Sequence, residues 1–392
     1  MRLIERKLFA PVPAYALRVF RAAVGAAALV KGIDLAARLR DVGSFRSDSL
    51  DWLGTLPQSA WPIVLAAWFV AAGALALGWR GRIAAAGLAL VAAFVMAFAG
   101  MYSNHLYLLA TFAALLALVD TRADTVPAWQ LWLLQLQVSV VYVFSALAKL
   151  NADFLPGNVL YYRASSSMFL PDLEPVAVAP LFAGLSVVAI LSELVIAGAL
   201  WSERLRALAF GLGGLLHTGM LVAISSTPEL ALRLVVFEML MLSSYLLFVA
   251  PAPLARTVVW DDGCGFCRTW VTWFGRLDWL HALRFVGRSD LERNGTSAVL
   301  ARHALEAVQL VGPHGTRRGG FEAVRRVAAV LPATFLVAPF MGIGPVRVVG
   351  DRAYRAVAAR RTCRLRAPVA RPSGRFARGA PEELPAPDRE LA

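Results

Sequence analysis

Long apolar runs alternate with short polar connections over the first 250 residues. A helix needs about twenty apolar residues to cross a bilayer, and runs near this length recur at eight places. They are residues 14–33, 61–79, 83–101, 105–120, 129–149, 176–200, 205–226 and 230–250. The pattern predicts an all-α polytopic membrane bundle of about eight transmembrane helices over residues 1–250.

The fifth run carries polar side chains at helical spacing, namely Gln135, Tyr142, Ser145 and Lys149. They fall on one stripe of an otherwise apolar helix, and such a stripe faces a bundle interior or a wet cavity. Asn151, Pro156 and Gly157 then end the helix. The stripe indicates a lined cavity with Lys149 at its end. The alternative is that Lys149 extends to the membrane interface as an ordinary snorkelling lysine.

Three further ionisable residues lie within later runs: Glu193, His217 and Glu238. Charges at membrane depth are costly unless they are paired. For Glu193 we expect a structural ion pair with Arg21, His217 or Arg233, whereas Glu238 has no obvious partner in the sequence. Small residues around His217 permit close helix approach.

After residue 250 the pattern changes to a short β-branched run, TVVW, followed by Asp261-Asp-Gly-Cys-Gly-Phe-Cys267 and a helical period. A strand leading to C-x-x-C at a helix N-terminus predicts a small α/β thioredoxin-like domain over 255–366. The helix dipole and backbone amides there favour thiolate at Cys264. We therefore expect Cys264 to attack and Cys267, one turn further in and more buried, to resolve the mixed disulfide.

Composition supports this division of the chain. Of its 392 residues, 58% are hydrophobic and 17% charged, which is typical of a multi-span membrane protein. Residues 251–392 hold 22 arginines and 12 acids, a net +10, against +3 before them. The arginines are scattered, so anionic lipid headgroups explain them better than nucleic acid. No metal is expected, because the further zinc ligands needed beside C-x-x-C are dispersed: His281, His303, His314 and Cys363. Residues 367–392 read as a disordered tail.

An even number of spans places both termini on one side of the membrane. The connections expected inside carry Arg80, Arg82, Arg122, Arg204 and Arg206, which favours cytoplasmic termini. The expected location is a bacterial-type inner (plasma) membrane with the C-terminal domain in the cytoplasm. In this topology Lys149 and His105 both lie near the outer face, and a histidine close to a lysine can relay a proton.

The segment Ser145–Gly157, SALAKLNADFLPG, resembles one shared by vitamin K-dependent gamma-carboxylases and their bacterial relatives, the HTTM membrane family. Asn104-His105 resembles the pair that opens an equivalent helix there, and that family also has a histidine in its late spans, for which His217 is the candidate. The resemblance implies that Lys149 is the base that deprotonates a vitamin K-like hydroquinone. A second lysine of the carboxylases is Ala148 here. Tyr142, Ser145, Asn104 and His217 are then the expected quinone contacts.

The C-terminal part resembles the DCC family of thiol-disulfide oxidoreductase-like domains. The residues that carry this resemblance are TVVWDDGCGFC, the strand Leu283–Val286, the segment Gly320–Val324 and Tyr354-Arg355. It implies a redox-active disulfide between Cys264 and Cys267.

Three functions follow. The first is a membrane-bound thiol-disulfide oxidoreductase with a quinone-binding, carboxylase-like membrane domain, lipids around it and a thiol or disulfide protein as partner. The second is a vitamin K-dependent carboxylase-like enzyme with Lys149 as base, although a luminal substrate-recognition part has no counterpart here. The third is a non-catalytic membrane binding module, which the intact C-x-x-C disfavours.

Overall fold

The computed structural model describes residues 2–47, 55–170, 175–249, 256–278, 283–293, 298–312, 316–331 and 333–359. The chain forms two compact units, Met1–Phe248 and Val249–Ala392. The predicted tail at 367–392 and the candidate zinc ligands His281, His314 and Cys363 lie outside the described residues.

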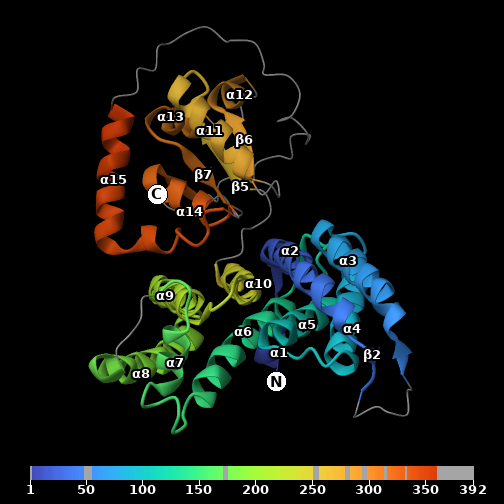
Figure 1. Ribbon diagram of the computed structural model, residues 1–392. Helices are drawn as coiled ribbons and strands as arrows, with labels where there is room; N and C mark the ends of the chain where they lie inside the picture. Colours follow the sequence, from blue (N-terminus) through green and yellow to red (C-terminus); the bar gives the residue numbers. More distant parts are fainter. Residues whose placement is uncertain are drawn as a thin grey trace. The chain divides into compact units, whose positions relative to one another are not determined.

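The first unit is a bundle of helices (Figure 1). The eight predicted apolar segments each coincide with one helix: α2 (Tyr15–Arg38), α3 (Trp61–Leu77), α4 (Gly81–Phe98), α5 (Asn104–Ala117), α6 (Ala128–Ala148), α8 (Pro175–Ala199), α9 (Arg206–Ile224) and α10 (Pro228–Ser244). Two short helices, α1 (Arg2–Leu8) and α7 (Asn158–Ser165), flank them. Among the described residues, six helices are long and apolar enough to cross a membrane. The other two are α5, which is shorter, and α2, which carries internal charges.

The helices pack in two groups that meet at α10. Helix α4 packs between α3 and α5, α2 packs against α3, and α8 packs between α6 and α9. Helix α10 contacts α2 and α5 on one side and α9 on the other. Two short antiparallel pairs tie loops at the ends of the bundle: β1 (Pro11–Pro13) with β4 (Thr125–Pro127), and β2 (Ser44–Phe45) with β3 (Leu56–Pro57).

Helices α2 and α3 approach each other without room for side chains between them. A Cβ on Gly25 would lie 2.4 Å from the backbone nitrogen of Ala76, so only glycine fits there. Trp68 on α3 donates its indole N–H to the carbonyl of Ala28 at 2.8 Å. The Arg21 guanidinium donates to α3 carbonyls, including that of Ala76 at 3.2 Å. The buried Arg21 charge is thus stabilised by carbonyl groups in the last turn of α3, which have no partner within their own helix.

The second unit is a small α/β domain built on a four-stranded sheet of order β6-β5-β7-β8. The strands are β5 (Arg256–Trp260), β6 (Leu283–Gly287), β7 (Gln309–Val311) and β8 (Arg317–Gly319). Strands β5 and β6 are parallel, with α11 (Gly265–Leu277) between them in the chain, whereas β7 and β8 are antiparallel to their neighbours. A βαβ unit followed by a hairpin and a helix is the predicted thioredoxin-like arrangement.

The remaining helices of this unit are α12 (Arg288–Arg293), α13 (Ala298–Glu306), α14 (Gly320–Ala328) and α15 (Gly344–Ala359). Val259 and Val311 of the sheet form a core with residues of α12 and α13, including Leu291, Leu300 and Ala304. This core holds the end of β5 in place, from which the C-x-x-C turn begins.

Candidate functional site

Tyr142 lies at the centre of a buried polar network inside the membrane unit. Its hydroxyl is 2.7 Å from Nε2 of His217 and 2.6 Å from the hydroxyl of Tyr245. These three side chains come from α6, α9 and the 3-10 turn Tyr245–Phe248 after α10. All three are buried. At Tyr142 the polar stripe of α6 therefore faces the interior of the bundle, as predicted.

Glu238 extends this network from α10. Its Oε2 lies 2.8 Å from Nδ1 of His217, the distance of an ion-pair contact but without the alignment of a hydrogen bond. Both carboxylate oxygens are buried and lack hydrogen-bond partners among the described residues. The expectation that Glu238 has no partner is thus corrected to an unaligned contact with His217. Tyr142, His217 and Glu238 form a continuous line of groups that can accept or donate protons.

Gly213 makes room for this network. A Cβ built on Gly213 would lie 1.8 Å from the hydroxyl oxygen of Tyr245, so a side chain there would displace the tyrosine. Close approach at small residues, expected around His217, occurs here on the same helix, α9. The glycine therefore sets the position of a ring that contacts Tyr142.

Lys149 lies at the end of α6 and pairs with Glu193 of α8. Its Nζ is 2.7 and 2.9 Å from the two carboxylate oxygens and 2.6 Å from the hydroxyl of Ser145, which itself donates to Glu193 at 2.7 Å. The Lys149 side chain is 20% exposed, whereas that of Glu193 is 4% exposed. The expected partners of Glu193, which were Arg21, His217 and Arg233, are wrong. The partner is Lys149, 44 residues earlier in the chain, because α6 and α8 pack antiparallel and bring Ser145 and Lys149 next to Glu193. The sequence does not show which helices pack together.

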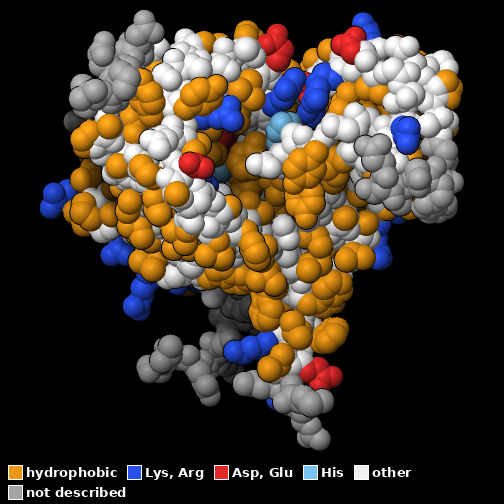
Figure 2. All heavy atoms as spheres, turned by 60° about the horizontal axis from the view of Figure 1, so that its bottom comes forward, with side chains coloured by type: hydrophobic (Ala, Val, Ile, Leu, Met, Phe, Trp, Pro, Cys, Tyr) orange, Lys and Arg blue, Asp and Glu red, His pale blue; other side chains and the backbone are white. Residues whose placement is uncertain are grey.

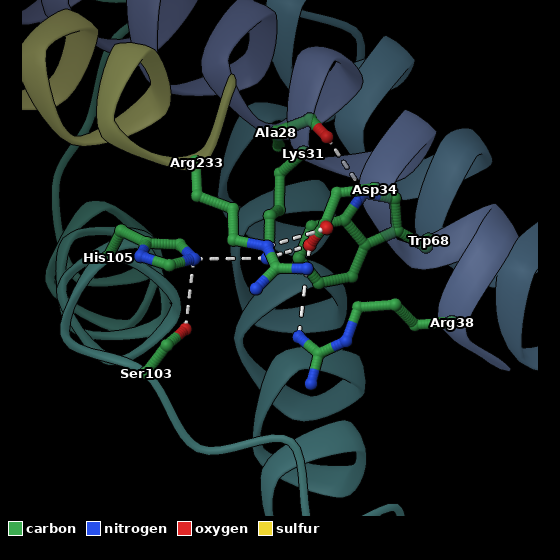
Figure 3. Close-up of polar contacts among 8 residues, drawn as sticks. All are labelled: Ala28, Lys31, Asp34, Arg38, Trp68, Ser103, His105 and Arg233. Carbon is green, nitrogen blue, oxygen red and sulfur yellow. Dashed lines mark hydrogen bonds and ion pairs between the residues drawn. The ribbon is translucent and has the colours of Figure 1, made fainter. Parts of the chain in front are cut away.

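His105 lies in a separate cluster of charged and polar residues from α2, α10 and the start of α5 (Figure 3). We call it the Asp34 cluster; its members are Lys31, Asp34, Arg38, Ser103, His105 and Arg233. Nε2 of His105 is 3.1 Å from Nζ of Lys31 and 3.0 Å from the hydroxyl of Ser103. The hydrogen bonds of Lys149 go instead to Ser145 and Glu193. The structure thus gives His105 a different lysine as its neighbour.

A signal for this cluster was present in the sequence. Lys31 and Asp34 are spaced three residues apart in a helix, which places them on one face, and both interrupt an apolar run. Lys31 is nevertheless fully buried. The last expected quinone contact, Asn104, is the first residue of α5 and is exposed.

The membrane unit is hollowed on the face shown in Figure 2. Basic and histidine side chains gather at the hollow among apolar ones, with acidic side chains nearby. Helices α2 and α6 end close to Arg38 and Lys149, and α5 and α10 begin close to His105 and Arg233. Charged groups thus gather at helix ends, where water reaches a bundle most readily.

In the second unit Cys264 is the N-cap of α11 and Cys267 lies in its first turn. Cys264 is buried, with 2% of its surface exposed, while Cys267 is half-buried. The expectation that Cys267 is the more buried thiol is therefore wrong. The reason is that the Asp261–Gly263 turn folds back at the end of β5, with the amide of Cys264 bonded to the carbonyl of Asp261 at 3.2 Å.

Two aspartates fasten this turn to the start of α12. The buried carboxylate of Asp261 accepts from the amide of Gly263 at 3.1 Å and from Nε of Arg288 at 3.4 Å. Asp262 accepts from the amide of Ser289 at 3.2 Å and from its hydroxyl. Because Arg288 offsets the charge of Asp261, the carboxylate opposes a thiolate at Cys264 less than its sequence position suggests.

An aromatic stripe lies on the outer face of α11 beside Cys267. Phe266, Trp270 and Trp273 are each about half exposed, at 45%, 49% and 54%. Their spacing of four and three residues puts them on one side of the helix. Exposed aromatic side chains in such a row are typical of a protein-binding surface.

The geometry defines an integral membrane protein that carries a thioredoxin-like thiol domain. Residues 9–252 match the family model of the HTTM domain, and residues 258–366 match that of the DCC1-like thiol-disulfide oxidoreductase. The chain belongs to the HTTM family, with a DCC1-like domain following the membrane unit. Neither the curated proteins nor the solved structures gave a significant match.

Proposed function

We propose that this protein is a membrane-bound thiol-disulfide oxidoreductase whose membrane unit binds a quinone-like molecule. The observation that carries the proposal is the C-x-x-C at the N-terminus of α11, in a domain that matches DCC1-like thiol-disulfide oxidoreductases. The exposed aromatic residues beside Cys267 favour a protein as the thiol or disulfide partner.

The exchange that we propose balances without a further reactant. The thiolate of Cys264 displaces one sulfur of a partner disulfide, forming a mixed disulfide and releasing the other sulfur as a thiolate. Cys267 loses its proton and attacks the Cys264 sulfur, which releases the second partner thiolate. The partner disulfide is thereby reduced and the Cys264–Cys267 pair oxidised. The same steps run backwards oxidise a partner dithiol.

The polar groups of the membrane unit fit a quinone-like ligand. The Glu238 oxygens are buried without aligned hydrogen bonds, and the Tyr142 and His217 pair beside them can donate to or accept from a ring oxygen. Tyr142, Ser145 and His217 would hold the ligand, whereas the expected contact at Asn104 stays a prediction; a bound quinone would supply an acceptor for two electrons and two protons. Lys149 and His105 are the groups that we assign to proton transfer at the outer end of the bundle.

A second candidate is a carboxylase-like reaction with Lys149 as base. The close contact between Lys149 and Glu193 bears on it, because the two carboxylate oxygens lie 2.7 and 2.9 Å from Nζ, in place to exchange a proton with it. A lysine acting as base must first pass its proton on, and the carboxylate of Glu193 is in place to take it, either directly or through the hydroxyl of Ser145.

Mixed-disulfide trapping tests the thiol assignment. In Cys267→Ser a disulfide reagent or partner should remain attached through Cys264, visible as a mass adduct on the intact protein, while Cys264→Ser should trap nothing. The matched control is Cys363→Ser. Trapping by Cys264→Ser alone would show that the exposure of Cys267, and not the N-cap position of Cys264, decides which thiol reacts first. If neither thiol reacts faster than Cys363, the redox assignment fails.

The quinone assignment has a separate test. Protein purified from membranes should carry a quinone that lipid extraction and mass spectrometry identify, and Tyr142→Phe with His217→Ala should reduce its amount. Equal amounts in the variant and the parent protein would contradict binding at this network.

A further inference from the structure

The Asp34 cluster holds more positive than negative charge. The carboxylate of Asp34 contacts Nζ of Lys31, lies 2.8 Å from Nε of Arg233 and 3.9 Å from a terminal nitrogen of Arg38 (Figure 3). Three cations thus share one carboxylate, which leaves two positive charges without a counter-ion inside the cluster. Glu229, one turn before Arg233 on α10, is exposed; its charge acts on Arg233 from a distance, but in the described part of the chain it forms no ion pair with the cluster.

Uncompensated charge is costly in a membrane protein unless something neutralises it. The cost is largest for Lys31, whose side chain is fully buried, and Asp34 is 5% exposed. A cluster that only joined α2 to α10 would need one cation for its carboxylate. The need to join two helices therefore does not explain why two further cations are present in the cluster.

The two arginines keep donors available. In the described part of the chain Arg233 engages its Nε on Asp34, and its two terminal nitrogens make no other bond. Arg38 contributes only the long 3.9 Å contact. Their side chains are 28% and 34% exposed, and Figure 3 shows both guanidinium groups reaching the same carboxylate from different helices. Planar guanidinium forks match the two oxygens of a carboxylate or phosphate.

The remaining members, Ser103 and His105, fix the shape of the site. His105 contacts both Lys31 and the hydroxyl of Ser103, so α5, which packs beside α10, lines a further part of the site. An anion reaching the two arginines would meet Lys31 as a deeper charge.

We propose that the Asp34 cluster is a binding site for an oxyanion, a carboxylate or phosphate group, held chiefly by Arg38 and Arg233. The group belongs either to a free small molecule or to a lipid headgroup, since both present the same chemistry. This inference does not depend on the thiol or quinone assignment.

The test is thermal unfolding of the intact, detergent-solubilised protein titrated with three probes: inorganic phosphate, acetate and phosphatidylglycerol. Sodium chloride at equal ionic strength is the reference. We expect at least one probe to raise the Tm saturably above the reference. A response to phosphate or acetate assigns a free anion, and a response to phosphatidylglycerol alone assigns a headgroup.

Arg38→Gln should lower the apparent affinity for that probe at least tenfold. The substitution removes one guanidinium group but leaves the shorter contacts of Asp34 with Lys31 and Arg233 in place. Arg40→Gln is the matched control, since Arg40 is exposed and stacks on Trp61, 5.3 Å from the ring centre, outside the cluster. Asp34→Asn removes the competing carboxylate and should tighten binding, whereas a purely structural ion pair predicts only a lower Tm. No probe effect above the reference, or equal affinity in Arg38→Gln and the parent, would overturn the proposal.

Discussion

At the scale of single residues, the proton transfer that we propose for the membrane unit depends on the ion pair between Lys149 and Glu193. The pair is anchored by Ser145, so the ammonium has three oxygen atoms within 2.9 Å. The carboxylate of Glu193 and the hydroxyl of Ser145 are therefore the groups in place to exchange a proton with Nζ.

We expect Lys149→Ala to abolish quinone-dependent oxidation of a dithiol by the purified protein, followed as loss of quinone absorbance. Lys149→Arg should fail as well, because arginine keeps the ion pair with Glu193 but does not act as a base near neutral pH. Lys7→Ala, at the N-terminal end of the chain, is the control. Full activity in Lys149→Ala would show that the lysine only extends to the interface.

Part of the membrane site could be predicted from the sequence. The inward direction of Tyr142 and Ser145 follows from helical spacing, because a polar stripe on an apolar helix leaves few alternatives. The partners Glu193, Glu238 and Tyr245 were not predictable, since they depend on which helices pack together and in what register. The Asp34 cluster was missed because Lys31 and Asp34 stand near the end of an apolar run, where charges are ordinarily exposed.

At the scale of elements, α14 carries a charge arrangement that depends on pH. Burial alone would raise the pKa of Glu322, but hydrogen bonds from Arg325 and Arg326 outweigh it and lower the pKa to about 2. A carboxyl whose pKa falls on folding contributes stability that is complete above its unfolded value, about 4.5. That contribution is lost as the pH drops from there toward 2.

We therefore expect the amides of α14 to lose protection against hydrogen exchange, corrected for intrinsic rates, between pH 4.5 and about 2 in the intact protein. Glu322→Gln should show lower protection at pH 6 and a smaller change over that range. Glu306→Gln, on α13, serves as the matched substitution. An unchanged pH response in Glu322→Gln would mean that another carboxyl controls this helix.

The elements themselves were largely predictable. Each apolar run became a helix, six of them long and apolar enough to cross a bilayer, because in lipid a helix satisfies its own backbone hydrogen bonds. TVVW became the buried strand β5. Which of the two cysteines is more buried was not predictable, since it depends on how Asp261 and Asp262 bind their turn to α12.

At the scale of the whole molecule, we predict that both ends of the chain face the cytoplasm. The turn before α5 would then be outside and the loop after it inside. Cysteine introduced at Tyr102, which is 66% exposed, should react with an impermeant maleimide added to intact cells, and cysteine at Arg122 should react only after lysis. The reverse pattern would invert the topology and move the thiol domain to the outer side.

The charges of α2 have a consequence for how the protein is made. Arg21, Lys31 and Asp34 each disfavour insertion of a helix by up to about 3 kcal/mol at the membrane centre. Asp34 meets Lys31 and Arg38 within its own helix, but Arg233 lies 199 residues later in the chain. At typical rates of synthesis that partner follows after roughly ten to forty seconds. Until then α2 depends on its own ion pairs and on α3, whose carbonyls receive Arg21. We expect residues 1–57 fused to a translocation reporter to insert poorly, and residues 1–80 to insert well. Equal insertion of the two would mean that α2 enters the membrane unaided, before α3 emerges from the ribosome.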